Sequence, residues 1–297
     1  MKRQRACIIG GTGFVGRHLL SRLRAAGYHC IVPTRRAHRH RDLKLYPDVE
    51  LRLLEDGEDF ASLFAGCALV VNLAGILNES GGTGFEAVHV GLVRRIVAGA
   101  EAASVPRLLH MSALHASAAE GGSAYLRSKG EGEDVAHGAA LAVTSFRPSV
   151  IFGRGDSFFN RFAGLLGMAP GLLPLACPNA RFAPVWVDDV VQAMVRSSTD
   201  PRTHGARYDL CGPRVFTLKE LLEYTARRLG KRVWILGLDD KRSRLMADLL
   251  GRLPGAPITL DNYLSMQTPS VCEEHNGLLQ LGIHPTDIDT VVPTYLG

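Results

Sequence analysis

The stretch ACIIGGTGFVG, residues 6–16, decides the fold of this chain. Its first four residues are apolar and typical of a buried strand, and glycines follow at once. Gly10, Gly13 and Gly16 are spaced by three, and Gly11 adds a G-x-G-x-x-G spacing. A helical apolar pattern then begins at Phe14. A strand, a glycine turn and a helix in this order predict a dinucleotide-binding loop.

The physical reason lies in the missing Cβ atoms. A tight turn without side chains lets the backbone approach a pyrophosphate, and the following helix presents unpaired N–H groups and a partial positive charge to it. A glycine turn without a ligand is the less favoured alternative. The residues predicted to surround the cofactor here are Gly10, Gly11, Thr12, Gly13, Phe14, Val15 and Gly16.

Outward from the loop, short apolar runs alternate with helical patterns. Strands are predicted at 6–9, 29–33, 49–54, 68–75, 105–112, 142–149 and 206–212, and helices at 14–26, 83–103, 123–137 and 186–198. Strands that alternate with helices indicate a parallel sheet covered on both faces. The predicted fold class is therefore α/β, a Rossmann-type doubly wound parallel sheet with a smaller C-terminal lobe.

The pattern changes after residue 150. Residues 151–183 are rich in Gly, Pro, Phe and Leu, and further helices are predicted at 158–166, 218–230 and 241–253. We therefore predict a dinucleotide-binding domain over 1–150, completed by 184–215. The remaining segments, 151–183 and 216–297, are predicted to form the smaller substrate or partner lobe.

Composition limits the class of protein. The chain has 297 residues, of which 46% are apolar, enough for a full core. No run of about 18 apolar residues occurs, so a transmembrane helix is not expected. The six cysteines are scattered without a C-x-x-C motif, and buried free thiols in a reducing cytoplasm are the favoured interpretation. We expect a cytoplasmic protein, with a peripheral position at the inner membrane left open.

The net charge of +5 is uneven, because residues 34–44 (TRRAHRHRDLK) carry five Lys and Arg residues. Such a run is either a solvated surface or a site for an anion. No aromatic residues interleave the charges, so nucleic acid is not expected as a partner. This segment and the basic helix at 241–252 leave an acidic protein or a membrane surface open as a partner.

The end of the second strand predicts which dinucleotide binds. An NAD site usually offers an acidic residue there for the ribose 2′-hydroxyl. Here the sequence is VPTRR, and Arg35 and Arg36 follow Thr34 where a 2′-phosphate would lie. Guanidinium groups bind phosphate strongly, so NADP(H) is predicted over NAD(H). Two arginines directed to solvent are the alternative. Asp56, after the third strand, is predicted to lie near the adenine.

Two further stretches complete the predicted cofactor site. NLAG, residues 72–75, ends the fourth strand, so the backbone of Leu73, Ala74 and Gly75 is expected to pass the cofactor. Tyr125 and Lys129 are four residues apart in SAYLRSKGEGE, and on a helix this spacing places both side chains on one face. A phenol beside an ammonium is suited to proton transfer, although the spacing alone also fits an inert helix surface.

Taken together, these motifs resemble the extended or atypical branch of the short-chain dehydrogenase/reductase superfamily, which includes epimerases and dehydratases. GGTGFVG, NLAG, Tyr125-x-x-x-Lys129, FRPSVIFG (146–153) and WVDDV (186–190) occur in the family's order and cover about two thirds of the chain. The stretches FRPSVIFGRGDSFFNRFA, YDLCGP and LGIHPTDIDTVVPTYL are similar to one subgroup. This subgroup comprises the NADPH-binding accessory subunit of respiratory complex I and its bacterial relatives, for which no settled substrate is implied.

The resemblance implies roles for individual residues. Tyr125 would be the acid or base, and Lys129 would lower the pKa of its phenol and bind the nicotinamide ribose. Pro148 would contact the cofactor. A hydroxyl residue after the fifth strand usually binds the substrate oxygen, but alignment leaves Ala113 at that position and Ser112 as the nearest replacement. His89 stands where the family has an asparagine.

Two functions remain open at this stage. The first is an oxidoreductase or epimerase that acts on a small apolar or isoprenoid-like substrate. The second is a non-catalytic protein for which NADPH is a structural or redox-sensing ligand, and Ala113 favours it. A substrate pocket is predicted among aromatic side chains, with core packing as the alternative, and no metal site is assigned. The residues proposed for that pocket wall are Phe152, Phe158, Phe159, Phe162 and Met168.

The remaining polar residues are expected to be structural. His110 lies within an apolar strand and is predicted to be a packed core histidine. Asp188 and Asp189 lie at the start of the helix predicted over 186–198, where carboxylates interact favourably with the helix dipole.

Overall fold

The computed structural model describes residues 3–55, 57–79, 82–169, 171–253 and 256–296. Its centre is a seven-stranded sheet in the order β11-β6-β5-β4-β1-β2-β3. Every pairing in this sheet is parallel. The strands are β1 (Arg5–Ile9), β2 (His29–Thr34), β3 (Val49–Leu53), β4 (Cys67–Asn72), β5 (Arg107–Met111), β6 (Ala142–Pro148) and β11 (Arg207–Leu210). This confirms the predicted Rossmann-type sheet.

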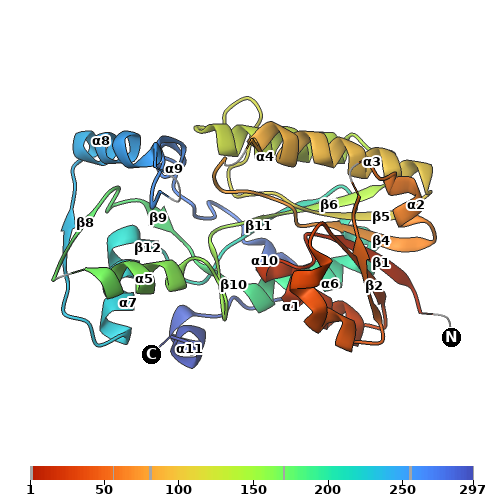
Figure 1. Cartoon of the computed structure of the whole chain (residues 1–297), viewed down its shortest axis with the longest axis horizontal. Coiled ribbons are helices and arrows are strands. Elements are labelled where there is room, and N and C mark those ends of the chain that lie inside the picture. The colour runs from red at the N-terminus through yellow and green to blue at the C-terminus, as the bar shows by residue number, and fades with distance from the viewer. Residues whose placement is uncertain (1–2, 56, 80–81, 170, 254–255, 297) are drawn as a thin grey trace.

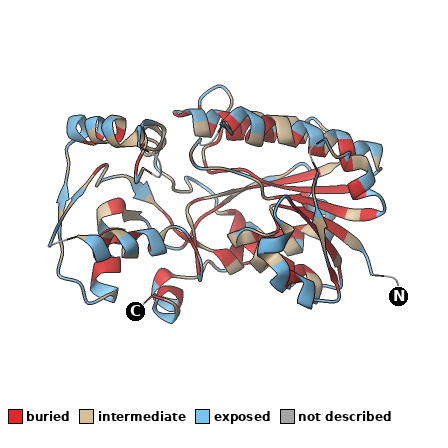
Figure 2. Ribbon diagram, in the orientation of Figure 1, coloured by how far each residue is buried: buried red, intermediate tan, exposed pale blue. Residues whose placement is uncertain are grey.

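Helices cover both faces of the sheet (Figure 1). One face carries α1 (Phe14–Ala25) and α6 (Val187–Thr199), whose leucines and valines pack on β1, β2 and β4. The other carries α2 (Phe60–Phe64), α3 (Leu92–Ala102) and α4 (Ala124–His137). Two cores therefore lie on either side of one sheet, and Figure 2 shows the strands between them as buried.

The predicted helix over 83–103 contains an irregularity that its pattern did not show. Its first part is a π-helix, η2 (Glu86–Gly91), and α3 continues from it. The chain also forms a 3-10 segment within the basic run, η1 (Ala37–Leu45), and α2, neither of which was predicted. Both are short, and η1 has only Leu43 buried, so neither leaves a strong apolar period.

The small lobe is built from short elements. Its helices are α5 (Phe159–Met168), α7 (Leu218–Arg228), α8 (Asp240–Gly251), α9 (Leu260–Ser265) and α11 (Ile288–Val291), and the 3-10 turn η4 (Val292–Thr294) follows α11. The short α10 (Gly277–Gln280) packs instead on β11 and α6, with Leu278 in the core of the sheet domain. A further 3-10 turn, η3 (Pro201–Thr203), follows α6. The strands of the lobe form two-stranded pairs: β7 (Ile151–Phe152) with β10 (Val185–Trp186), β9 (Arg181–Phe182) with β12 (Phe216–Thr217), and β8 (Leu172–Leu175) with β13 (Trp234–Gly237). The predicted domain boundaries stay predictions.

Two expectations about the lobe are wrong. Phe152 and Phe159 are fully buried and Phe162 nearly so, in a core shared with α7, while Met168 is 77% exposed. These side chains therefore pack the lobe and do not wall a pocket. Cys211 and Cys272 form a disulfide, whereas free thiols were expected; Cys7, Cys30, Cys67 and Cys177 are free. Their 61-residue separation gave no local signal.

The structural roles expected for two polar groups are confirmed. His110 is buried in β5 beside Asn72, with 3.2 Å between Asn72 Nδ2 and His110 Nδ1. Asp188 and Asp189 lie in the first turn of α6, where Asp188 accepts from Arg22 and Asp189 accepts from the Thr286 amide. Among the described residues, no helix is both long and apolar enough to cross a bilayer.

Candidate functional site

The candidate site lies where the strand order changes direction. β1 and β4 are neighbours at the centre, and the chain continues from β1 toward β3 on one side and from β4 toward β11 on the other. In open parallel sheets, ligands bind outside the carboxyl ends of the strands at such a point. Most of the residues predicted to hold a cofactor follow β1, β2, β4 and β6 at this edge.

The glycine loop runs from the end of β1 into α1. Gly10 has φ +81°, in the left-handed region that favours glycine, and a Cβ there would lie 3.0 Å from the carbonyl carbon of Leu73. The Gly13 amide donates to the Gly10 carbonyl over 3.0 Å and closes the turn. The loop is therefore held against the end of β4, where only glycine fits.

The start of α1 offers backbone donors to an anion. Gly13 is the N-cap of α1, and because glycine has no side chain, no side-chain hydrogen bond caps this helix. The first turn of α1 also contains no acidic residue. A Cβ on Gly16 would overlap the Gly10 carbonyl oxygen, so the helix packs directly on the loop. Thr12 is half-buried beside this turn, and Phe14 and Val15 begin the helix. An uncapped N-terminus on a close-packed glycine loop fits a pyrophosphate.

The end of β2 positions the predicted arginines. Thr34 is buried, its hydroxyl accepts from the Arg36 amide over 3.3 Å, and both Arg35 and Arg36 are exposed. Behind them, Arg17 of α1 donates to the carboxylate of Asp42 in η1. The arginine holds the pKa of Asp42 below its usual range. This ion pair fastens the basic segment to the glycine-loop helix.

The next strand ends at a cavity of about 560 Å³. Arg52, Leu53, Glu55, Gly57, Glu58 and Ser62 line it. The cavity lies in the turn between β3 and α2. The sequence predicts that the adenine binds near this turn, because Asp56 follows the third strand. Asp56 itself lies outside the described residues, so its assignment stays a prediction.

The end of β4 is fixed by a side chain that the sequence reasoning had not used. Asn72 is buried, and its Oδ1 accepts from the Ala74 amide over 3.1 Å. The Leu73 amide donates to the Ile9 carbonyl. Leu73, Ala74 and Gly75 therefore leave the sheet beside the glycine loop. A Cβ on Gly75 would lie 3.9 Å from Lys129 Nζ, so this turn faces the predicted catalytic helix.

Tyr125 and Lys129 lie one turn apart on α4, as their spacing predicted. Lys129 is 5% exposed, and its Nζ donates to the Met111 carbonyl at the end of β5 over 2.6 Å. Tyr125 is half-buried and packs edge-on to His89, with 5.6 Å between the ring centroids. The pair is therefore held at the carboxyl edge of the sheet.

The electrostatics differ from the expectation for this pair. Burial, and then the Asp261 carboxylate, raise the pKa of Tyr125 to about 12. Burial also lowers the pKa of Lys129 to about 8, against the opposing effect of Glu133. The expected lowering of the tyrosine pKa by Lys129 does not occur in this structure, in which burial and Asp261 both raise that pKa. Tyr125 is thus a protonated donor at neutral pH.

Ser112 is buried and its hydroxyl is engaged. It donates to Glu133 over 2.6 Å, and Glu133 also accepts from Arg147 and lies 2.9 Å from Arg207 Nε. This buried carboxylate between two arginines joins β5, β6, β11 and α4. Ala113 packs with Tyr125, Ala116 and Leu126. Ser112 stays a prediction as a catalytic residue, and its hydroxyl proton is donated to Glu133.

His89 lies in the π-helix η2 and links three elements. Its Nε2 accepts from the Ile76 amide over 3.1 Å, and its Nδ1 lies 2.9 Å from the Ser128 hydroxyl. Burial first, and Lys129 second, lower the pKa of His89 to about 3. A neutral His89 therefore joins the turn after β4 to α4 and carries no charge near neutrality.

The small lobe reaches the catalytic helix through α9. Asp261 accepts from the amides of Ala124 and Tyr125 over 2.7 and 3.2 Å. The Ser265 hydroxyl donates to the Ser123 hydroxyl over 2.7 Å, and Asn262 reaches the Leu77 carbonyl. The N-terminus of α4 is therefore capped by its own Ser123 and by a carboxylate from the other lobe. Pro148 ends β6, and its carbonyl accepts from the Leu114 amide.

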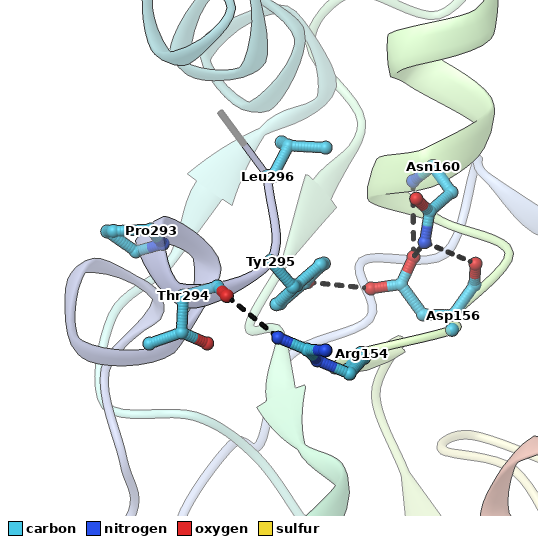
Figure 3. A pocket seen from close by; sticks show the side chains of 8 residues that line it. Arg154, Asp156, Asn160, Pro293, Thr294, Tyr295 and Leu296 are labelled. Atoms are coloured by element: carbon cyan, nitrogen blue, oxygen red, sulfur yellow. Dashed lines mark hydrogen bonds between the residues drawn. The ribbon is translucent and has the colours of Figure 1, made fainter.

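A second hollow, of about 600 Å³, lies in the small lobe (Figure 3). At its wall Asp156 accepts from Gly153 N, Asn160 N and the Tyr295 hydroxyl, the last over 2.8 Å. Burial, and then Asp156, raise the pKa of Tyr295. These bonds clamp the C-terminal segment to the lobe, and none of the predicted site residues lines this hollow.

Comparison with protein families identifies the chain. The NAD dependent epimerase/dehydratase family matches residues 6–211, from the first strand to the end of the sheet domain.

The chain belongs to this family.

Its relatives and structural neighbours agree. It is 33% identical over 226 residues to NADH dehydrogenase [ubiquinone] 1 alpha subcomplex subunit 9, mitochondrial, of Mus musculus, which confirms the predicted subgroup resemblance. That alignment covers 74% of this chain and 59% of the mouse subunit. The NADPH-dependent quinone oxidoreductase QOR2 of Escherichia coli, complexed with NADPH, superposes with a TM-score of 0.76 at 19% identity, over 96% of this chain and 97% of that one.

A third comparison bears on the cofactor. UDP-glucuronic acid 4-epimerase of Bacillus cereus, in complex with UDP-glucuronic acid and NAD, superposes with a TM-score of 0.67 at 16% identity, over 89% of this chain and 99% of that one. Family and fold together therefore support binding of a nicotinamide dinucleotide. The neighbours include both an NADPH and an NAD complex.

Sequence reasoning missed three groups that shape the site. Asp261 lies in the capping box T-L-D-N (259–262), which marks the start of α9. Nothing in this local pattern indicates that Asp261 also caps the N-terminus of α4. Glu133 lies in the quoted stretch SAYLRSKGEGE, but nothing local indicated its two arginine partners. Arg17 follows the glycine loop directly, and its partner Asp42 was hidden within a run of basic residues.

Proposed function

We propose that this chain is an NADP(H)-binding oxidoreductase or epimerase of the short-chain dehydrogenase/reductase type, acting on a small apolar or isoprenoid-like substrate. The observation that carries the proposal is the placement of Tyr125 and Lys129 on one face of α4. Lys129 Nζ is fixed on the Met111 carbonyl and faces the turn at Gly75. The glycine loop opens at the same edge of the sheet.

The roles of the chain's own groups follow from their charge states. A bound nicotinamide would supply or accept the hydride. Tyr125, with a pKa of about 12, holds a proton at neutral pH that it can donate to a substrate carbonyl oxygen. Lys129, with a pKa of about 8, is mostly cationic there and is placed to bind ribose hydroxyls. The arrangement favours the reductive direction.

Substrate class is proposed from the shape of the chain around Tyr125. The segment from Ser112 to Tyr125 is short, and between the buried Ser112 and Ser123 its buried side chains are apolar: Ala113, Leu114 and Ala116. The segment contains no Lys or Arg for the phosphates of a nucleotide-sugar, and its one acidic residue, Glu120, would repel them. The Escherichia coli neighbour, a quinone oxidoreductase, offers a precedent for an apolar carbonyl substrate in this fold. Quinones and small ketones are therefore the first substrates to test.

The preference for NADP(H) rests on Arg35 and Arg36, exposed after β2 with no acidic residue before them. Arg35→Asp is expected to raise the ratio of NADPH to NADH dissociation constants at least tenfold. Arg39→Asp makes the same charge change at another exposed position of η1 and is the control. Titration of both nucleotides by fluorescence measures the ratio. An unchanged ratio in the Arg35 variant contradicts the assignment.

Catalysis is tested by Tyr125→Phe. The variant is expected to bind NADPH with unchanged affinity and to lose at least a hundredfold in the rate of NADPH oxidation by the quinone or ketone that the unmodified protein reduces. Tyr263→Phe, at a tyrosine of α9 in the small lobe, is the control and should retain the rate. Undiminished oxidation by Tyr125→Phe contradicts the role of the phenol.

A second candidate function is a non-catalytic protein that holds NADPH as a structural or redox-sensing ligand. The contacts of Ala113 and Ser112 favour it: Ala113 offers no hydroxyl, and Ser112 donates its own to Glu133. This function predicts nucleotide binding, thermal stabilisation by NADPH and no turnover with any carbonyl panel. Identification of the nucleotide that copurifies, followed by its oxidation with quinones, separates the two functions.

We further propose a cytoplasmic location with peripheral contact to a membrane or to an acidic protein. The mouse relative is a mitochondrial NADH dehydrogenase subunit, and partnership with other subunits would be carried over from it. Fractionation of cells expressing a tagged chain tests this location. Release from membranes by salt is the expected result, and recovery only in the salt-free soluble fraction contradicts it.

A further inference from the structure

Large apolar side chains are exposed at one end of the small lobe. β8 and α8 lie at the end farthest from the seven-stranded sheet (Figure 1), and α8 is largely exposed along its length (Figure 2). We call the apolar set on β8, β13 and α8 the lobe-end surface. Its members, with their exposed fractions, are Leu172 (50%), Trp234 (82%), Leu236 (51%), Leu245 (58%), Leu249 (56%) and Leu253 (58%).

The strand pair presents one apolar face outward. Trp234 pairs with Leu172 and Leu236 pairs with Pro174 in the parallel register. Because side chains alternate along a strand, Ile235 turns inward and packs against the lobe core. The outward positions therefore carry an indole and leucines where a solvated strand pair would carry polar groups.

Helix α8 also directs apolar side chains outward. Leu245, Leu249 and Leu253 recur every four residues and lie on one side of α8 and its C-terminal end. The opposite side, with Ser243 and Ala247, is fully buried, and the Ser243 hydroxyl accepts from the Cys177 amide over 3.0 Å. The helix is thus held by these residues and by Met246 and Leu250, which pack against a small core of the lobe. Three further leucines face outward, so α8 carries apolar side chains on its solvent side as well as on its packed side, which an ordinary surface helix does not.

Basic residues accompany these side chains. Residues 231–253 contain six Lys and Arg and three acidic residues. Lys231 and Arg232 are exposed directly before Trp234, and Lys241 and Arg252 are exposed on the leucine side of the helix. Exposed tryptophan and leucine with flanking cations are the composition of segments that lie in the interface of anionic membranes.

We propose that the lobe-end surface docks on an anionic lipid bilayer, with Trp234 and the α8 leucines entering the headgroup region. The cations would contact lipid phosphates, and the apolar side chains would leave water. A bilayer fits better than an acidic protein because the exposed apolar groups stand outward on a strand pair and a helix, and neither of the two hollows described above lies among them. The proposal is independent of catalysis at Tyr125.

The test uses the intrinsic fluorescence of the indole. The chain has two tryptophans, so Trp186→Phe leaves Trp234 as the sole indole. Vesicles of phosphatidylcholine with phosphatidylglycerol are expected to shift its emission to the blue and to sediment with the protein, less so as salt is added. Pure phosphatidylcholine vesicles should bind at least tenfold more weakly.

Variants assign the binding to the surface. In the unaltered chain, Leu245→Ser with Leu249→Ser is expected to weaken partitioning at least tenfold, and Trp234→Ser with Leu236→Ser likewise. Lys231→Gln with Arg232→Gln should weaken it roughly fivefold for each charge. Leu279→Ser, on the similarly exposed Leu279 of α10 (56%), is the matched control and should bind as the unaltered chain does. Unchanged NADPH binding shows that each variant is folded.

Three results would overturn the proposal. The first is emission from Trp234 that anionic vesicles do not shift. The second is binding that the leucine and tryptophan variants leave intact. The third is self-association without lipid that the same variants abolish and that vesicles do not reverse, because the surface would then join two copies of the chain.

Discussion

Two parallel strand pairings in this molecule differ in how far their apolar side chains are exposed. In the central sheet, Ile8, Val70 and Leu108 are fully buried between two layers of helices. In the pairing of β8 with β13, Leu172 and Trp234 are 50% and 82% exposed. A parallel sheet is normally covered on both faces, whereas one face of the small pair is uncovered and contributes little buried surface to folding. The comparison separates residues that stabilise the fold from residues that are available to a partner.

The largest expected effect contrasts two helical glycines. Gly132 of α4 packs against η2, and a Cβ there would overlap the His89 carbonyl oxygen, whereas a Cβ on Gly164 of α5 meets nothing within 4 Å. Gly132→Ala is therefore expected to lower the free energy of unfolding by about 4 kcal/mol or more. Gly164→Ala should raise it by up to about 1 kcal/mol. Urea unfolding measures both, and equal effects would contradict the contrast.

The strand pairings themselves are compared with leucines. Leu108→Ala removes a fully buried side chain of β5 and should lower the free energy of unfolding by about 3 kcal/mol. Leu172→Ala, at a position of β8 that is 50% exposed, should change it by less than about 0.5 kcal/mol. Thermal unfolding without lipid measures both. A comparable loss of unfolding free energy in Leu172→Ala would mean that the small pair stabilises the fold as much as the central sheet does.

Acid should weaken the sheet domain through His89. Its folded pKa of about 3 lies below the ordinary value of 6.5, so the unfolded chain binds more protons between these values. Stability from this group is complete above about pH 6.5 and falls as pH decreases, by roughly 2.5 kcal/mol near pH 4.5. His89→Gln, which keeps an acceptor for the Ile76 amide, should flatten this fall. His275→Gln, at an exposed histidine, should leave the pH profile of unfolding unchanged.

The smallest effect concerns the contact between the two regions. Asp261→Asn keeps the shape of the side chain but removes its charge from the N-terminus of α4, so the free energy of unfolding should fall by about 1 kcal/mol. The pKa of Tyr125 should also fall, because the Asp261 carboxylate contributes to its elevation. Spectroscopic titration of the phenols measures that shift. Asp248→Asn, in an exposed pair with Arg252, is the control and should alter neither quantity.

Much of the sheet domain was predictable because its signals are local. The glycine spacing at Gly10–Gly16 requires a turn that no other residue fits, and apolar runs of strand length alternate with helical periods. The Tyr125 and Lys129 spacing likewise placed both side chains on one face. In the small lobe the same reasoning placed α5, α7 and α8 but assigned Phe152 and Phe159 to a pocket, because an aromatic cluster has the same pattern in a core and in a cavity wall.

The sequence by itself determined the Rossmann order of elements, the cofactor edge and the catalytic-type pair, since each follows from residues near one another in the chain. Tertiary structure alone decided the partners of these groups. Glu133 lies between Arg147 and Arg207, Asp261 caps a helix 136 residues away, and Cys211 pairs with Cys272. It also decided that Trp234 faces outward. Such contacts join distant segments, and their burial and pKa values depend on packing that no local period encodes.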